Sequence, residues 1–76
     1  MWQNGKKITA LWASNDDHNA WFFAAGLGWR KLSSATQNVF LQQLAVVSAA
    51  YQKNSSVNFF EVGIPGNIEI QQIYSF

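Results

Sequence analysis

The sequence predicts a mainly β domain of the α+β class, with five strands and one helix between the third and fourth strands. Two observations predict this fold. Short segments rich in aromatic and β-branched residues recur along the chain, separated by clusters of turn formers, which is typical of strands. One longer segment, residues 39–51, instead repeats its apolar residues at helical spacing. The 76 residues make one domain, near the size at which a single core gives marginal stability.

The first three strands are expected before the helix, at residues 6–14, 20–25 and 29–33. In the first strand, alternation places Ile8, Ala10 and Trp12 on one face. Residues 15–19 (NDDHN) are turn formers, so a loop joins the first two strands. The glycines of residues 26–28 (GLG) predict a bend between the second strand and the third.

The third strand carries two adjacent side chains of opposite character, Trp29 and Arg30. A guanidinium stacks well on an indole, so the two could form a ligand-binding pair. Adjacent residues of a strand, however, point to opposite faces. We therefore expect Trp29 to lie in the core and to be separated from Arg30.

The helix is expected to begin after Ser33 or Ser34 and to run to about Lys53. Ser34, with Gln37 three residues later, has the spacing of a capping box. Lys53 suits the C-terminus because its charge complements the helix dipole. One apolar stripe is expected to face the core. The stripe comprises Phe40, Leu44, Val47 and Tyr51.

This helix carries more apolar surface than one core requires. Ten of the thirteen residues in VFLQQLAVVSAAY (39–51) are hydrophobic, and no charged residue occurs between Lys31 and Lys53. A surface helix normally keeps its outer side charged. We therefore expect the second face to pack on another subunit. The expected interface residues are Val39, Val46, Ala49 and Ala50.

Two further strands are expected after the helix, at residues 57–62 and 68–76, joined by a turn with the only proline. Alternation in the last strand places these residues on one face: Ile68, Ile70, Tyr74 and Phe76. The resulting order of elements is that of the OB-fold, a five-stranded, partly open barrel. Other small α+β sheets share the same order.

The composition argues against catalysis. The chain has no cysteine and one histidine, so it contains no disulfide and no Cys/His zinc spacing. Asp16, Asp17 and His18 are adjacent, whereas a calcium loop spreads its ligands over about twelve residues. Ser14 and His18 lack the turn and oxyanion motifs of a hydrolase triad. We expect no enzyme activity, no metal and no cofactor.

Charge and hydropathy narrow the partners. The net charge is +1 and the basic residues cluster only at 6–7 and 30–31, which argues against a nucleic-acid-binding stripe. No run of 18 apolar residues exists, so no membrane span is expected. The start, MWQN, lacks the pattern of a secretory signal. This fits a cytoplasmic protein, or a secreted or periplasmic one whose signal peptide has been removed.

The loop after the first strand combines polar and aromatic residues. Ser14, Asn15 and Asp16 carry short hydrogen-bonding side chains, and Trp12 and Trp21 flank them. A sugar ring presents hydroxyls at its edge and an apolar C–H face, so it needs both kinds of group. These five residues are the candidate glycan site. The same run of polar residues is also typical of a solvated turn.

A resemblance to a known family points the same way. Residues 40–62, FLQQLAVVSAAYQKNSSVNFFEV, resemble the helix-to-strand unit of the AB5 toxin B subunits of the pertussis and subtilase cytotoxin group. The closing strand, Ile70-x-x-Ile73-Tyr74, is consistent with that pattern. The resemblance covers roughly the last half of the chain. The chain departs from the family in lacking its usual disulfide.

The resemblance implies a ring of five subunits whose helices line a central pore. It also implies recognition of host cell-surface glycans, often ending in sialic acid, and a toxic A subunit as a further partner. In that family the sugar site includes a serine after aromatic residues near the end of the first strand. The matching region here is residues 11–16, LWASND, and the matching residue is Ser14.

The sequence is also compatible with two other functions. An OB-fold can bind single-stranded nucleic acid by stacking bases on aromatic residues in a positive groove, and here the aromatics are present without the groove. A purely structural oligomerisation module would form the same ring without a ligand. The preferred prediction is a non-catalytic, glycan-binding B subunit that assembles as a homopentamer.

Overall fold

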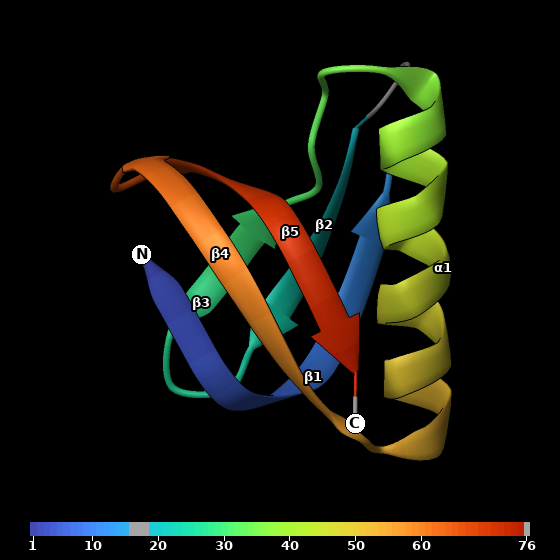
Figure 1. Ribbon diagram of the computed structural model, residues 1–76, viewed down its shortest axis with the longest axis vertical. Coiled ribbons are helices and arrows are strands. Elements are labelled where there is room, and N and C mark those ends of the chain that lie inside the picture. The colour runs from blue at the N-terminus through green and yellow to red at the C-terminus, as the bar shows by residue number, and fades with distance from the viewer. Residues whose placement is uncertain (16–18, 76) are drawn as a thin grey trace.

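The computed structural model describes residues 1–15 and 19–75. It shows a closed barrel of five strands with one long helix packed along its side (Figure 1). The elements are β1 (Trp2–Ala13), β2 (Ala20–Ala24), β3 (Gly28–Lys31), α1 (Gln37–Lys53), β4 (Ser56–Ile64) and β5 (Asn67–Ser75). The predicted order of elements is confirmed, including the helix between the third and fourth strands.

The barrel closes in the order β1-β2-β3-β5-β4, and β4 pairs back with β1. Neighbouring strands are antiparallel except β3 and β5, which run parallel and pair at Lys31 and Glu69. The long β1 is shared, because its first half pairs with β4 and its second half with β2. Its pairing with β4 shifts near Gly5, whose φ of 64° favours glycine. This arrangement is consistent with the expected OB-like barrel.

The core lies inside the barrel and between the barrel and the helix. Its largest fully buried side chains are Phe22, Leu32, Val47, Val57, Phe59 and Ile70. Phe22 on β2 and Phe59 on β4 meet edge to face, with ring centroids 5.3 Å apart and planes at 85°. Burying one such side chain stabilises the fold by about 1.5–3 kcal/mol, which is a large share of the stability of so small a domain.

A bulge in β1 changes the face of its aromatic residue. The pairing of β1 with β2 shifts between Ile8 and Ala10. Ile8 is therefore buried, whereas Trp12 is exposed. The prediction that Ile8, Ala10 and Trp12 share one face is wrong, because an extra residue in one strand reverses the alternation beyond it.

A second shift occurs in β5. Its pairing with β4 steps from Gln72 to Ile70, which leaves Gln71 as the extra residue. Ile70 is buried and Tyr74 is exposed. The prediction that these two residues lie on one face is therefore wrong, and Phe76 lies outside the described residues.

The helix begins later than the two predicted serines. Thr36 is the N-cap, and its Oγ1 accepts a hydrogen bond from the Val39 N–H at 3.1 Å. Ser34 Oγ instead donates to Glu69 Oε2 at 3.0 Å. The predicted capping box is wrong because this contact holds Ser34 against β5 before the helix starts. Lys53 occupies the last turn, as predicted.

The side of α1 that meets the barrel is rotated from the predicted stripe. Its buried residues are Gln43, Val47 and Ala50, with Phe40 and Leu44 packed beside the core. Tyr51, predicted to face the core, is exposed. Ala50 is only 1% exposed within the subunit. Its small side chain therefore packs in the subunit's own core, and its predicted place in a subunit interface stays a prediction.

A buried glutamine ties the helix to the barrel. Gln43 Oε1 accepts a hydrogen bond from the Ser33 N–H at 2.7 Å. Gln43 Nε2 donates to the Ile70 carbonyl at 3.4 Å and to the Gln71 carbonyl at 3.1 Å. Both polar atoms of the side chain therefore have partners, so burying them leaves no unpaired group.

Candidate functional site

Three tryptophans from three neighbouring strands lie on the outer face of the barrel. Trp12 on β1 is opposite Trp21 on β2. Trp29 on β3 is opposite Phe23, which follows two residues after Trp21. Trp12, Trp21 and Trp29 line a hollow of about 330 Å³. We call these three residues the aromatic platform. Trp12 and Trp29 are 49% and 44% exposed, so a ligand can reach their rings.

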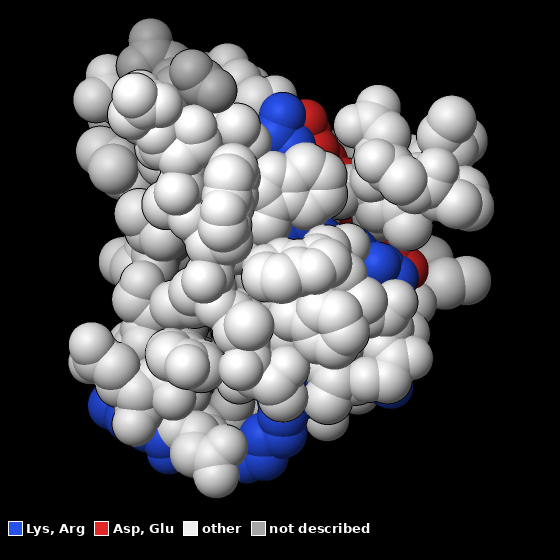
Figure 2. Space-filling view, turned by 180° about the vertical axis from the view of Figure 1, so that it is seen from behind, with Lys and Arg blue, Asp and Glu red and all other residues white. Residues whose placement is uncertain are grey.

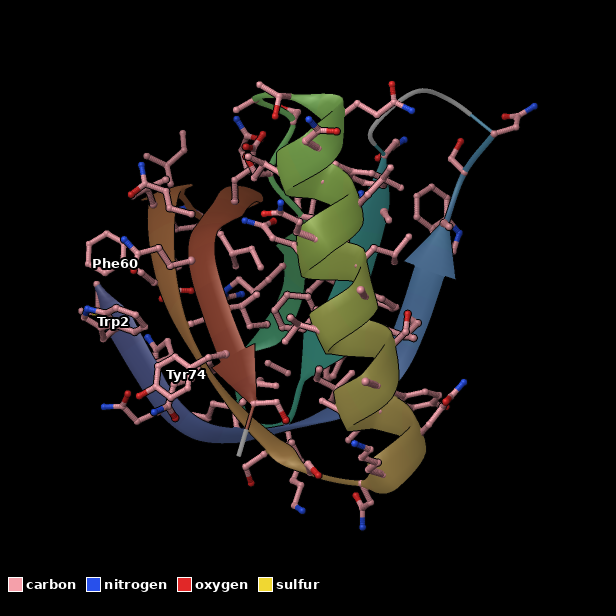
Figure 3. All side chains as sticks on the ribbon, turned by 45° about the vertical axis from the view of Figure 1, so that its right-hand side comes forward. Trp2, Phe60 and Tyr74 are labelled. Atoms are coloured by element: carbon pink, nitrogen blue, oxygen red, sulfur yellow. The ribbon has the colours of Figure 1, made fainter. Side chains whose placement is uncertain are left out.

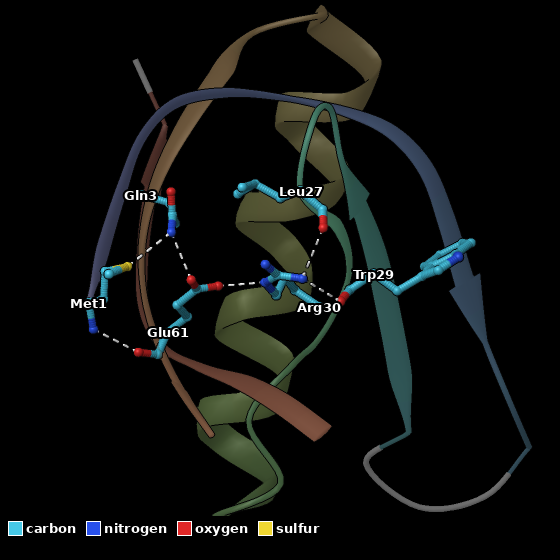
Figure 4. Close-up of polar contacts among 6 residues, drawn as sticks. All are labelled: Met1, Gln3, Leu27, Trp29, Arg30 and Glu61. Carbon is cyan, nitrogen blue, oxygen red and sulfur yellow. Dashed lines mark hydrogen bonds and ion pairs between the residues drawn. The ribbon is translucent and has the colours of Figure 1, made fainter. Parts of the chain in front are cut away.

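The phase of the alternation along β2 and β3 decides which side chains form the platform. Phe22 and Arg30 are buried, so their neighbours Trp21 and Trp29 face outward. The prediction that Trp29 lies in the core is wrong, since Arg30 is the buried residue, at 8% exposed. Figure 4 shows the Arg30 side chain directed toward Glu61 and the Trp29 ring directed away from it.

Two contacts orient two of the three platform rings, those of Trp21 and Trp29. Trp21 Nε1 donates a hydrogen bond to Asn19 Oδ1 at 3.0 Å. Phe23 and Trp29 meet edge to face, with ring centroids 5.4 Å apart and planes at 86°. Rings held in this way lose little further freedom when a ligand binds, which favours affinity.

The predicted polar residues follow the strand that carries Trp12. The Ser14 N–H donates to the Asn19 carbonyl at 3.0 Å, which closes the base of the loop. Ser14 Oγ donates to Asn15 Oδ1 at 3.5 Å. The described lining of the hollow consists of tryptophans, so Ser14 and Asn15 stand beyond the platform rather than within it. Asp16 lies outside the described residues.

A second hollow adjoins the platform and extends toward the turn between β4 and β5. Its volume is about 490 Å³. Its lining residues are Trp21, Leu27, Trp29, Arg30, Pro65, Gly66 and Ile68. Trp21 and Trp29 line both hollows. The predicted site missed Trp29 and the β4–β5 turn, because only the barrel topology brings that turn beside β3.

The guanidinium at the edge of the second hollow is engaged inside the barrel (Figure 4). Arg30 Nε donates to Glu61 Oε2 at 2.5 Å. Arg30 Nη1 donates to the Trp29 carbonyl at 3.0 Å and to the Leu27 carbonyl at 3.5 Å. The ion pair therefore offsets the charge of Arg30 where it borders the hollow.

The carboxylate of this pair is held in its charged form. Burial raises the pKa of Glu61, but hydrogen bonds from Arg30 and Gln3, together with the charge of Arg30, outweigh that effect. The Gln3 bond joins its Nε2 to Glu61 Oε1 at 2.8 Å. The pKa of Glu61 therefore lies below its ordinary value.

A separate aromatic cluster occupies the other half of the barrel (Figure 3). Trp2, Phe60 and Tyr74 come from β1, β4 and β5. The Trp2 ring lies 5.5 Å from that of Phe60 and 6.1 Å from that of Tyr74, both edge to face. Asn58 Nδ2 donates to Tyr74 Oη at 2.6 Å. Trp2 is thus an exposed tryptophan that does not belong to the aromatic platform.

An apolar groove lies between α1 and β5, with a volume of about 480 Å³. Its lining residues are Ala45, Val46, Ala49, Lys53, Ile73, Tyr74 and Ser75. Two predicted interface residues, Val46 and Ala49, are therefore on the groove, and Ala49 is exposed. Val39 is half-buried near the start of the helix.

The structure also bears on metals and membranes. Within residues 1–15 and 19–75, no three His, Asp or Glu side chains gather as a metal site. Asp16, Asp17 and His18, which the sequence raised as ligands, lie outside those residues. Over the same described ranges, the structure has no helix of the length and apolarity needed to cross a membrane.

Comparison with known proteins adds no family to these observations. No protein-family model matches the chain. No curated protein matches it significantly.

Proposed function

We propose that this protein is a non-catalytic glycan-binding subunit that recognises host cell-surface glycans on the aromatic platform. We further propose that it assembles as a ring, most simply the homopentamer of the AB5 toxin B subunits that its sequence resembles. In such a role it acts outside the cell that makes it, with a toxic A subunit as partner. One observation carries the proposal: three exposed tryptophans line a single hollow.

The chemistry of a sugar suits such a surface. A pyranose ring has an apolar C–H face that packs on an indole, and hydroxyls at its edge that need polar groups. The platform offers the indoles, and Ser14 and Asn15 supply polar side chains at the end of β1. OB-like barrels bind oligosaccharides and oligonucleotides on the face around β2 and β3, which is where Trp21 and Trp29 lie.

Charge favours a sugar over a nucleic acid. The platform consists of uncharged residues, and Arg30 beside it is paired with Glu61. Seen from behind, the molecular surface is mostly uncharged. Lys and Arg lie at its lower end and at two places higher up, each of these two beside Asp or Glu (Figure 2). A site for single-stranded nucleic acid needs a positive groove along the backbone.

Assembly would strengthen weak binding by each subunit. The groove between α1 and β5 offers apolar surface to a neighbour, through Val46 and Ala49. Several sites that engage one cell surface can raise avidity by about 10² to 10⁴ without new contacts. A ring of weak sites is therefore a sufficient mechanism for cell-surface recognition.

The test is capture on a glycan array by the wild-type protein and two tryptophan variants. Trp29→Ala removes a platform ring, so we expect at least a tenfold loss of capture. Trp2→Ala removes a tryptophan of similar exposure from the separate cluster, so we expect unchanged capture. Equal capture by wild type and Trp29→Ala would contradict the proposed site. An array on which the wild type captures nothing would contradict the function.

A second candidate, binding of single-stranded nucleic acid, has one observation in its favour. Lys31 is opposite Trp21 across β2 and β3, so a cation lies beside the platform. The two functions differ in their response to salt. The affinity for a nucleic acid falls steeply between about 50 and 200 mM salt, because it depends on phosphate contacts. The affinity for a neutral sugar does not.

A further inference from the structure

We infer that the two adjoining hollows form one groove that takes the interior of a neutral glycan chain, at least three rings long. The inference rests on the proposed function and narrows its ligand class. It differs from recognition of a single terminal sugar. It also differs from recognition of a terminal sialic acid, whose carboxylate would need hydrogen-bond donors or a cation at the site.

The surface formed by the two hollows is longer than one sugar ring. The platform hollow and the second hollow share Trp21 and Trp29, so a ligand on one continues onto the other. Their volumes are about 330 and 490 Å³. Each alone falls within the range of roughly 300–1,000 Å³ found for small-molecule sites. Together they exceed what one terminal ring can fill.

The platform end of the groove is aromatic. Its lining consists of three indoles, and the Nε1 donor of Trp21 is engaged by Asn19. Such a surface selects a flat ligand with an apolar face. A pyranose with equatorial hydroxyls presents C–H groups on both faces, and chains of such rings form flat ribbons. Glucose and N-acetylglucosamine chains joined by β1,4 links have this form.

The other end of the groove, formed by the second hollow, is largely apolar. The second hollow is bounded by Leu27 from the β2–β3 turn and by Pro65 and Ile68 from the β4–β5 hairpin, which add apolar walls. Its one cation, among the described lining residues, is Arg30. Arg30 Nε is held by Glu61, and Nη1 is held by two backbone carbonyls. Because Glu61 already offsets the charge of Arg30, this end of the groove favours a neutral ring over a carboxylate.

The test is the affinity of the assembled protein for chito-oligosaccharides of one to four rings, measured by calorimetry. We expect the dissociation constant to fall at least tenfold from one ring to three and to level off after that. We expect 3′-sialyllactose to bind no more tightly than lactose. The same protein is applied to the glycan array, so that the ligand class is surveyed in parallel.

Two variants locate the ends of the groove. Trp12→Ala removes one end and Ile68→Ala removes the other, so each should lower the affinity for the three-ring chain. Neither should change the affinity for the single ring as strongly, because Trp21 and Trp29 remain. Trp2→Ala, on the separate cluster, should leave the whole series unchanged. Thermal unfolding of each variant separates loss of binding from loss of fold.

The outcomes distinguish the inference from the function on which it rests. Equal affinity for one ring and for four overturns the extended groove but leaves glycan binding in place. Capture of sialylated glycans alone overturns the neutral ligand class and again leaves the function. No capture of any glycan, together with salt-sensitive binding of a single-stranded oligonucleotide, overturns both.

Discussion

Glu61 is the residue on which the buried charge of the barrel depends. Its carboxylate accepts hydrogen bonds from Arg30 and Gln3. The side chains of Arg30 and Glu61 are only 10% and 11% exposed. Removing one partner of a buried pair leaves an uncompensated charge and costs about 3–5 kcal/mol. Because the second hollow borders Arg30, the same carboxylate also controls the charge that a ligand meets there.

Replacing this carboxylate should therefore weaken the fold in a pH-dependent way. At pH 7 we expect Glu61→Gln to lower the free energy of unfolding by about 3 kcal/mol, measured by urea denaturation. The pKa of Glu61 is lower in the folded protein than its ordinary value of 4.5. Its stabilisation is thus present above pH 4.5 and is lost as the pH falls through the folded pKa.

The difference between wild type and Glu61→Gln should accordingly shrink in acid. Gln3→Ala is a useful comparison, because it removes a hydrogen bond from Glu61 and keeps the ion pair. A difference that stayed constant from pH 7 into the acid range would show that the charge of Glu61 is not the cause.

Ser14 tests the polar side of the proposed site. Its hydroxyl stands at the end of the strand that carries Trp12 and contacts Asn15. Loss of one ligand hydrogen bond is worth about 1 kcal/mol, so we expect Ser14→Ala to weaken glycan capture several-fold up to tenfold. Assembly should not change. Ser55→Ala, after the helix, is the matched control. If Ser14→Ala captured as well as wild type, the site would consist of the platform without the loop.

Trp29 and Arg30 show what could not be predicted from the sequence, namely which of two adjacent side chains points into the barrel. Alternation correctly separated the two side chains onto opposite faces. It could not fix which one turned inward, because hydrophobicity favours Trp29 there. The deciding contact is with Glu61, which is 31 residues away in the chain. A pairing over that distance has no local signal.

Among the elements, the β4–β5 hairpin forms one wall of the second hollow beside the aromatic platform. β4 ends at Ile64 and β5 begins at Asn67, so the turn is short. Gly63 and Gly66 both have positive φ, of 119° and 87°. A Cβ on Gly63 would lie 2.3 Å from the Asn67 carbonyl oxygen, whereas one on Gly66 would meet open space. The two glycines therefore differ in packing although both have left-handed conformations.

This difference predicts unequal effects of the same substitution. Gly66→Ala should cost about 1–2 kcal/mol, because an L-residue resists this region of φ. Gly63→Ala should cost more, because the hairpin backbone must also shift away from the new methyl group. Urea denaturation of both variants measures the two losses. Equal losses would mean that the close approach at Gly63 does not limit the hairpin.

Sequence patterns placed most elements but not their irregularities. The predicted strand at 57–62 lies within β4, and the predicted turn at 63–67 contains the observed one. These are local signals of alternation and turn formers. The bulge at Gln71 depends instead on how β5 meets β4. The residues of one strand alone do not specify it, which is why the faces of Ile70 and Tyr74 were assigned wrongly.

For the whole molecule, the outer surface of α1 is the main argument for assembly. Leu41 and Tyr51 are exposed, and the groove toward β5 contains Val46 and Ala49. Large exposed apolar patches on small domains usually mark interaction sites. Packing on a neighbour would also add buried surface to a core that is small for an independent domain.

Solution mass tests this directly. By light scattering we expect a mass near five times the 8.6 kDa of the chain. Val46→Glu should dissociate the assembly while keeping the circular dichroism of the fold, because it places a charge in the apolar groove. Gln52→Glu adds the same charge at an exposed position of the helix and should not dissociate it. A monomeric wild type, or an intact Val46→Glu assembly, would overturn the interface.

The order of elements could be predicted because each element is written in consecutive residues. The closure of the barrel could not, since the parallel pairing of β3 with β5 rests on one pair, Lys31 and Glu69. The platform is similar. The sequence indicated Trp12 and Trp21 through their neighbouring loop, whereas Trp29 joins them through strand pairing alone.

The side chain of Gln43 has a consequence for how the molecule folds. Its amide accepts from Ser33 beyond the end of β3 and donates to the carbonyls of Ile70 and Gln71 on β5. The side chain thus acts like a peptide group between β3 and β5, beyond the single residue pair at which these two strands are paired. A residue of the helix thus adds to the pairing of β3 with β5, so closure of the sheet and docking of the helix stabilise each other. Barrel and helix should therefore form and melt together, in one cooperative transition.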